Sequence, residues 1–199
     1  MNLQTRVTNI LTKPKGEWPV IAAEPATVAG IYSEYVMILA AIGPICTFIG
    51  MMVFGVSLPL VGTYRIGFAQ GLTTLVFSYV LALVGIYVTA FVIQKLAPTF
   101  QSQPDLIQAF KLVAYSSTPS WVAGVLYLIP QLGPLVLLAA LYGVYICYLG
   151  MAPVMKTPQD KVIPYMVVAA IVIIVVMLVM GAISGALTAA FFGMPKIGI

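Results

Sequence analysis

The residues of this sequence that could take part in chemistry stand beside or within long uncharged stretches. One acid and one base each directly precede such a stretch, and four consecutive hydroxyl residues stand before Pro119. A carboxylate and an ammonium group at the same face of a membrane can pair, fix a helix bundle or line a vestibule. Hydroxyls beside a helix break can bind a lipid headgroup or an ion. The candidate ligand- or lipid-binding residues are therefore Glu34, Lys111, Tyr115, Ser116, Ser117 and Thr118.

Each candidate also has a structural interpretation. Glu34 and Lys111 can mark the headgroup boundary, because a charge there costs far less than the roughly 2.5–3.5 kcal/mol of the bilayer centre. Proline lacks an amide hydrogen, so it frees one backbone carbonyl, and a hydroxyl such as that of Ser116 can satisfy that carbonyl. Gly181 and Gly185 let helices approach closely, either within one bundle or in a homodimer.

The sequence contains no pattern typical of an enzyme, a cofactor site or a metal site. It has no histidine, so serine and cysteine nucleophiles lack their usual base, and Cys46 and Cys147 are too far apart to suggest zinc. No glycine-rich phosphate loop occurs. The basic residues are scattered singly and form no stripe for nucleic acid. We expect no catalytic residue, no cofactor, no metal and no nucleic-acid partner.

Four long uncharged stretches set the architecture that must position the candidate residues. They cover residues 35–64, 66–94, 112–155 and 162–195 of a chain that is 62% apolar and only 7% charged. A membrane-spanning helix needs about 20 apolar residues, so the third stretch has room for two. We predict an all-α, polytopic membrane protein with five transmembrane helices, at about 35–56, 68–93, 112–129, 135–150 and 165–192.

Residues 1–34 form the sizeable segment outside the predicted spans. Leu3, Val7, Ile10 and Leu11 follow helical spacing, which predicts a short amphipathic helix that ends before Pro14. The opposite side of this helix is polar and consists of Gln4, Arg6, Thr8 and Asn9. Such a helix can lie flat on the membrane surface, or it can pack on the protein's own loops. We expect Trp18 at the interface, with its indole N–H in water.

The distribution of lysine and arginine predicts the orientation. Seven of these residues fall in the N-terminal segment and in the second and fourth loops, and two fall in the first loop and near the C-terminus. Basic residues favour the cytoplasmic side, which places the N-terminus in the cytoplasm and the C-terminus outside. An odd number of spans agrees with this assignment. We expect a bacterial or archaeal cytoplasmic (inner) membrane.

Three groups of motifs follow one another along the chain. Pro14, Trp18 and Glu24 precede the first span, the hydroxyl run before Pro119 lies in the third, and the segments 148–150 and 155–161 follow the fourth. In this order they resemble the Yip family of Ypt/Rab-interacting membrane proteins, in its short prokaryotic form. The resemblance implies five spans and a cytoplasmic N-terminus. Eukaryotic members are linked to Rab-type GTPases, but their long N-terminal segment is missing here, which leaves a GTPase partner in doubt.

We therefore predict a non-enzymatic membrane protein of the Yip type that binds partners or organises the membrane. Membrane lipids are the expected partners, and a second copy of the chain is a candidate through Gly181 and Gly185. The alternative is a transporter, channel or scramblase that moves a lipid, an ion or a small solute through the helix bundle. It would use the broken third span and the side of the bundle where Glu34 and Lys111 stand.

Overall fold

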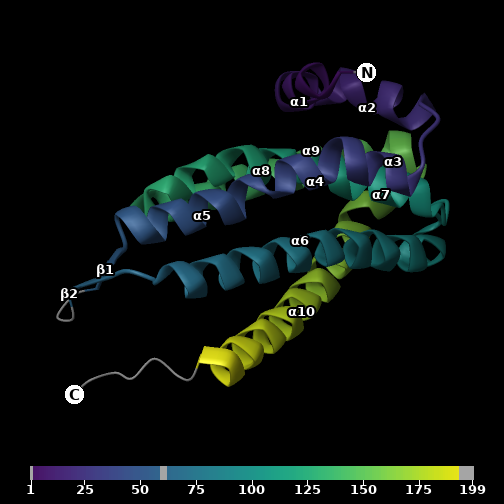
Figure 1. Cartoon of the computed structure of the whole chain (residues 1–199). Coiled ribbons are helices and arrows are strands. Elements are labelled where there is room, and N and C mark those ends of the chain that lie inside the picture. Colours follow the sequence, from purple (N-terminus) through teal and green to yellow (C-terminus); the bar gives the residue numbers. More distant parts are fainter. Residues whose placement is uncertain (1, 59–61, 193–199) are drawn as a thin grey trace.

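The computed structural model describes residues 2–58 and 62–192, and most of them are helical (Figure 1). The first half contains α1 (Leu3–Thr12), α2 (Pro14–Ala23), α3 (Val28–Ile31), the π-helical turn η1 (Tyr32–Val36), α4 (Met37–Ala40), α5 (Ile42–Val53), and the short antiparallel strands β1 (Val56–Leu58) and β2 (Gly62–Tyr64). The second half contains α6 (Phe68–Leu96), η2 (Ala97–Phe100), α7 (Leu106–Ser116), α8 (Thr118–Ala123), η3 (Gly124–Leu128), η4 (Pro130–Leu135), α9 (Val136–Met155) and α10 (Gln159–Phe192).

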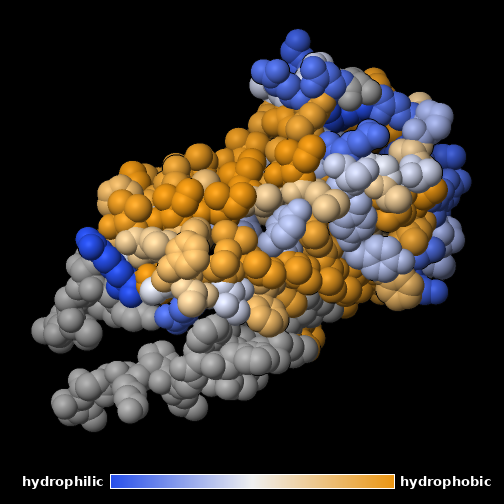
Figure 2. All heavy atoms as spheres, in the orientation of Figure 1, coloured by the Kyte–Doolittle hydropathy of each residue, from blue (hydrophilic) through white to orange (hydrophobic). Residues whose placement is uncertain are grey.

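Three helical stretches among the described residues are long and apolar enough to cross a membrane: Val28–Val53, Phe68–Phe100 and Pro130–Met155. Their outer faces carry large apolar side chains, such as Val76 (51% exposed) and Leu138 (64% exposed). In Figure 2 hydrophobic surface covers the middle of the molecule, and hydrophilic residues gather over α1 and α2. So much exposed apolar surface is stable against lipid and not against water. The chain is therefore a membrane protein, while the count of five spans stays a prediction.

The observed helices lie where the uncharged stretches predicted them, but several ends differ. The first long helical stretch begins at Val28 instead of residue 35, because the Thr27 hydroxyl caps it by accepting from the Gly30 amide at 3.0 Å. This stretch is interrupted at Ala41, between α4 and α5. Pro44 has no amide hydrogen for the carbonyl four residues earlier, which accounts for the interruption.

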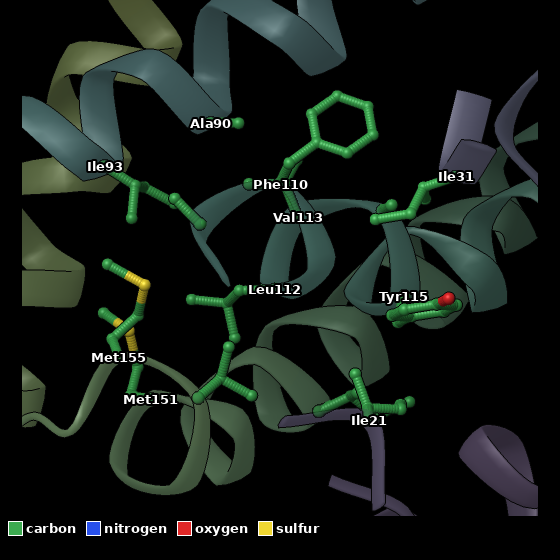
Figure 3. Close-up of a cluster of buried hydrophobic side chains, with 14 of the residues drawn as sticks. Ile21, Ile31, Ala90, Ile93, Phe110, Leu112, Val113, Tyr115, Met151 and Met155 are labelled. Atoms are coloured by element: carbon green, nitrogen blue, oxygen red, sulfur yellow. The ribbon is translucent and has the colours of Figure 1, made fainter. Parts of the chain in front are cut away.

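The third predicted span differs most from the structure. Asp105 caps α7 by accepting from the amides of Ile107 (2.8 Å) and Gln108 (3.1 Å), so this helix begins before the expected residue 112. The helix ends at Ser116, and Pro119 lies in the first turn of the separate helix α8. Every residue from 109 to 116 is buried. Helix α7 is thus a central helix, packed against α2, α6 and α9 (Figure 3).

The N-terminal segment and the second and fourth loops assemble at one end of the molecule. The Gln103 amide donates to the Met155 carbonyl at 2.9 Å, and the Ser102 hydroxyl donates to Thr157 at 2.8 Å. Gln108 Nε2 reaches back to the Ala22 carbonyl at 3.2 Å. The β1–β2 hairpin lies away from this end (Figure 1). The three segments that hold most of the basic residues are therefore neighbours in space.

Close helix contacts depend on glycine at two crossings. A Cβ atom on Gly150 would lie 2.6 Å from both Leu112 Cδ1 and Trp18 Cε2, and one on Gly143 would lie 2.7 Å from the Ser116 carbonyl oxygen. Both contacts bring α9 against its neighbours at a distance that a larger residue would prevent. Gly181 and Gly185 lie in the part of α10 whose side-chain surroundings are outside the described residues, so their packing role stays a prediction.

The replacement Gly150→Ala should lower stability, because the added methyl group must displace Trp18 or Leu112. Overpacking of this kind costs about 1–3 kcal/mol, which reversible unfolding in mild detergent would measure. Gly85→Ala is the matched control, since a Cβ there meets no described atom within 4 Å and alanine favours the helix. Equal stability of the two variants would contradict the tight packing of α2 on α9.

Candidate functional site

A buried arginine holds the N-terminal hairpin, α1 and α2, over the bundle. Arg6 is 4% exposed, and its Nη1 donates to Glu17 Oε1 at 2.5 Å while its Nη2 donates to Glu24. Asn9 Nδ2 donates to the second oxygen of Glu17 at 3.0 Å. The guanidinium lies 5.5 Å from the centre of the Tyr115 ring, within the range of a cation–π contact. One cation therefore joins α1, α2, the segment that follows α2, and α7.

A second buried cation fixes the C-terminal end of α2. Lys111 is 2% exposed, and its Nζ donates to the carbonyls of Ile21 (2.8 Å) and Glu24 (2.6 Å). The end of a helix attracts positive charge, because its last carbonyls are unpaired and the helix dipole is negative there. Lys111 thus binds α2, and the described residues contain no ion pair between it and Glu34.

Trp18 lies in the protein core, so the prediction that its indole N–H lies in water is wrong. Its side chain is fully buried, and Nε1 donates to the Ile146 carbonyl at 2.9 Å. The ring lies beside Gly150 and meets the Tyr115 ring edge to face, with 6.4 Å between centroids. A backbone carbonyl of α9 replaces water as the partner of the indole N–H, which removes the reason for Trp18 to stay at the surface.

Helix α1 packs on the protein, but on helices, including α2, α8 and α9, instead of on loops. Ile10 is fully buried, and the Tyr142 hydroxyl donates to the Leu11 carbonyl at 2.7 Å. The exposed side of α1 is polar and consists of Gln4, Thr5, Thr8 and Thr12. Arg6, expected on the polar outer side, turns inward because two carboxylates compensate its charge.

A cleft of about 780 Å³ opens beside the docked hairpin. Its walls come from α1, from the segment after α2, from the first turns of the first long helix and from α7: Leu3, Arg6, Glu24, Pro25, Ala26, Thr27, Gly30, Ile31, Glu34, Tyr35 and Tyr115. The volume is in the range of about 300–1,000 Å³ that is typical of small-molecule sites. The cleft combines carboxylates and phenol groups with apolar side chains, so it can bind a ligand that is polar at one end and apolar at the other.

The six predicted binding residues separate into two groups. Glu34 and Tyr115 both line the cleft; Glu34 is exposed, and Tyr115 is 8% exposed. Lys111 and the other three members are buried or half-buried within the bundle and do not line it. The structure therefore brings two of the six together at one cavity and leaves the others in the helix packing.

The hydroxyl run stabilises the break before Pro119. The Ser117 hydroxyl donates to the Val113 carbonyl at 2.8 Å, and Thr118 Oγ1 shares a buried 2.7 Å hydrogen bond with the Tyr35 hydroxyl. Ser116 Oγ, the hydroxyl expected to satisfy the freed carbonyl, has no hydrogen-bond partner among the described residues. These contacts are structural, and they tie α7 and α8 to the first long helix.

Sequence reasoning overlooked Arg6, Glu17 and Tyr35 as residues of this site. One signal was available for the acidic pair. Glu17 and Glu24 are spaced by seven residues, which places them on the same side of a helix, and Arg6 is the arginine that precedes them.

The replacement Arg6→Gln should detach the hairpin, because it leaves the buried Glu17 carboxylate without its cation. Removal of one partner of a buried ion pair costs about 3–5 kcal/mol. We expect a lower unfolding midpoint together with faster proteolysis between α1 and α3. Lys15→Gln, at an exposed position of α2, should change neither. A variant Arg6→Gln that is as stable and as resistant as this control would show that the network does not hold the hairpin.

Comparison with known proteins shows the family of the chain. The Yip1 domain matches residues 8–181 of the chain. The inner membrane protein YohC of Escherichia coli K12 is 28% identical over 164 residues, which cover 79% of this chain and 82% of that protein, and YohC of E. coli O6:H1 matches to the same extent. No solved structure matches the chain significantly. Because the domain match extends over most of the sequence, from α1 into α10, the chain belongs to the Yip1 domain family.

Proposed function

We propose that this protein is a non-enzymatic, five-span protein of the bacterial inner membrane that binds a ligand in the cleft beside its N-terminal hairpin. The observation that carries the proposal is the Arg6 network. It joins α1, α2 and α7 through buried contacts, and the same arrangement forms the walls of the cleft. The cleft exists only while the hairpin is docked. A molecule bound there is the most direct way for this protein to engage partners or to organise the membrane.

The arrangement of the basic segments supports the proposed topology. The N-terminal segment, the second loop and the fourth loop are linked by hydrogen bonds at one end of the molecule. With this end in the cytoplasm, the cleft faces the inner leaflet. The third span would then run from α7 through η3, and the fifth would be α10. The inner-membrane name of the E. coli relatives is consistent with this location.

The transport alternative has less support from the contacts. Transport through the bundle needs polar groups along a path, and the break before Pro119 was the candidate for that path. Ser117 and Thr118 are instead engaged in hydrogen bonds, and the core cluster contains apolar side chains of α7 such as Phe110 and Leu112. Lys111, the other candidate, is held by the carbonyls of α2. Binding of a ligand in the cleft therefore accounts for more of the observed contacts than transport of a solute through the bundle does.

A photo-crosslinking amino acid at Thr27, on the wall of the cleft, should capture a discrete ligand in native membranes. The control position is Val76, which is 51% exposed on the outer face of α6 and should report the bulk lipid. We expect mass spectrometry to find an adduct at position 27 whose composition differs from that at position 76. Identical adduct profiles at the two positions would contradict a binding function of the cleft.

A further inference from the structure

We propose that the cleft selects a lipid headgroup that carries a primary ammonium group, with Glu34 and the Tyr115 hydroxyl as its ligands. This inference rests on the proposed function and names the ligand class for it. The argument uses the charges around the cleft, the free hydroxyl of Tyr115 that lines it, and its position relative to the first long helix.

The charges around the cleft leave a place for one cation. Arg6 and Lys111 supply two positive charges, and Glu17, Glu24 and Glu34 supply three negative charges. Arg6 is neutralised by the first two carboxylates, whereas Glu34 is exposed and has no ion pair with a described residue. A single positive group of a ligand would balance Glu34. An anionic headgroup would instead meet an excess of negative charge.

The Tyr115 hydroxyl is an independent sign of a polar ligand. The residue is 8% exposed, it lines the cleft, and its hydroxyl has no hydrogen-bond partner among the described residues. Figure 3 shows this ring extending from α7 on the same side as Ile31, another residue of the cleft wall. A free phenol hydroxyl at a cavity can take a hydrogen-bond partner from a bound ligand. A ligand N–H that donates to Tyr115 would supply one, in the same cavity as Glu34.

The two groups favour a primary ammonium over a quaternary one. Quaternary ammonium groups bind mainly to the faces of aromatic rings. One face of Tyr115 is taken by Arg6, and Tyr35 and Tyr115 pack edge to face with 4.7 Å between centroids. What the cleft offers is a carboxylate and a phenol oxygen, which accept hydrogen bonds. A primary ammonium group has three N–H donors for them, and a trimethylammonium group has none.

The position of the cleft points to a lipid as the carrier of this group. Four of its lining residues, Gly30, Ile31, Glu34 and Tyr35, belong to the first turns of the candidate span Val28–Val53. Leu3 and Ile31 make part of the wall apolar. The next turn of the same helix exposes Met37 (44%) and Ile38 (50%). An acyl chain can follow these side chains while its headgroup occupies the cleft, which no soluble amine would do.

Native mass spectrometry of the full chain in detergent, titrated with dioctanoyl lipids, tests this proposal. Phosphatidylethanolamine should bind about tenfold more tightly than phosphatidylcholine, which has the same charge but no N–H, and more tightly than phosphatidylglycerol. Glu34→Gln and Tyr115→Phe should each remove most of this preference. Neither variant should change the unfolding midpoint much, because Glu34 is exposed and phenylalanine keeps the ring. Asp160→Asn, which removes an exposed carboxylate outside the cleft, should bind as the wild type does.

Three results would overturn the proposal: equal affinity for the ethanolamine and choline lipids, a preference that survives both cleft variants, or competition by glycerophosphoethanolamine as strong as that of the lipid. The third would assign the site to a soluble amine. If the crosslinker at Thr27 captures a discrete ligand but the lipids bind equally, only the headgroup assignment fails. If Thr27 captures nothing beyond the bulk lipid, the binding function itself fails.

Discussion

The charge of Arg6 has almost no access to solvent, and the need to compensate it organises the N-terminal part of this protein. Desolvation of an ion costs several kcal/mol, which its partners must recover. Here the partners are two carboxylates and the face of an aromatic ring, and they come from α2, from the segment after it and from α7. These partners contact the guanidinium together only when the segments are arranged as observed. The hairpin is therefore a fixed part of the fold, and the cleft beside it has defined walls.

Helix α7 shows how a membrane protein can hold polar groups without exposing them to lipid. It is enclosed by α2, α6 and α9, so Lys111 and Ser116 face protein on every side. Lys111 is compensated by carbonyls at the end of α2, and the break before Pro119 is stabilised by the hydroxyl groups of Ser117, Thr118 and Tyr35. The polar contacts of the bundle thus concentrate around one central helix, at the end where the basic loops assemble.

The sequence predicted the positions of the long helices because a run of twenty or more uncharged, apolar residues is stable mainly as a helix within a bilayer. The predicted spans begin later than the helices do, since Thr27 and Asp105 cap their helices from outside the apolar stretches. The packing of the N-terminal hairpin was harder to predict from the sequence. A charged residue such as Arg6 is taken as exposed unless its partners are known, and Glu17 reaches it only after the chain turns between α1 and α2. Trp18 likewise packs where a distant glycine, Gly150, leaves room.

Of the candidate site, Glu34 and Tyr115 were predictable because one marks the start of an apolar stretch and the other belongs to a polar run inside one. That Glu34 and Tyr115 line the same cavity could not be predicted, since the cavity depends on the docked hairpin. The pairing of Glu34 with Lys111 was expected from their shared side of the membrane. It does not occur because the carbonyls of α2 bind the lysine, and helix α2 itself was not predicted.

The account depends most directly on the docked position of the hairpin. Double electron–electron resonance in lipid nanodiscs can measure it with spin labels at Thr8 and Gln103, which are both exposed, in a chain whose native residues Cys46 and Cys147 are replaced by alanine. We predict one narrow distance distribution between the labels. A broad or multiple distribution would show that α1 and α2 move independently of the bundle, and would contradict the fixed hairpin and the cleft that depends on it.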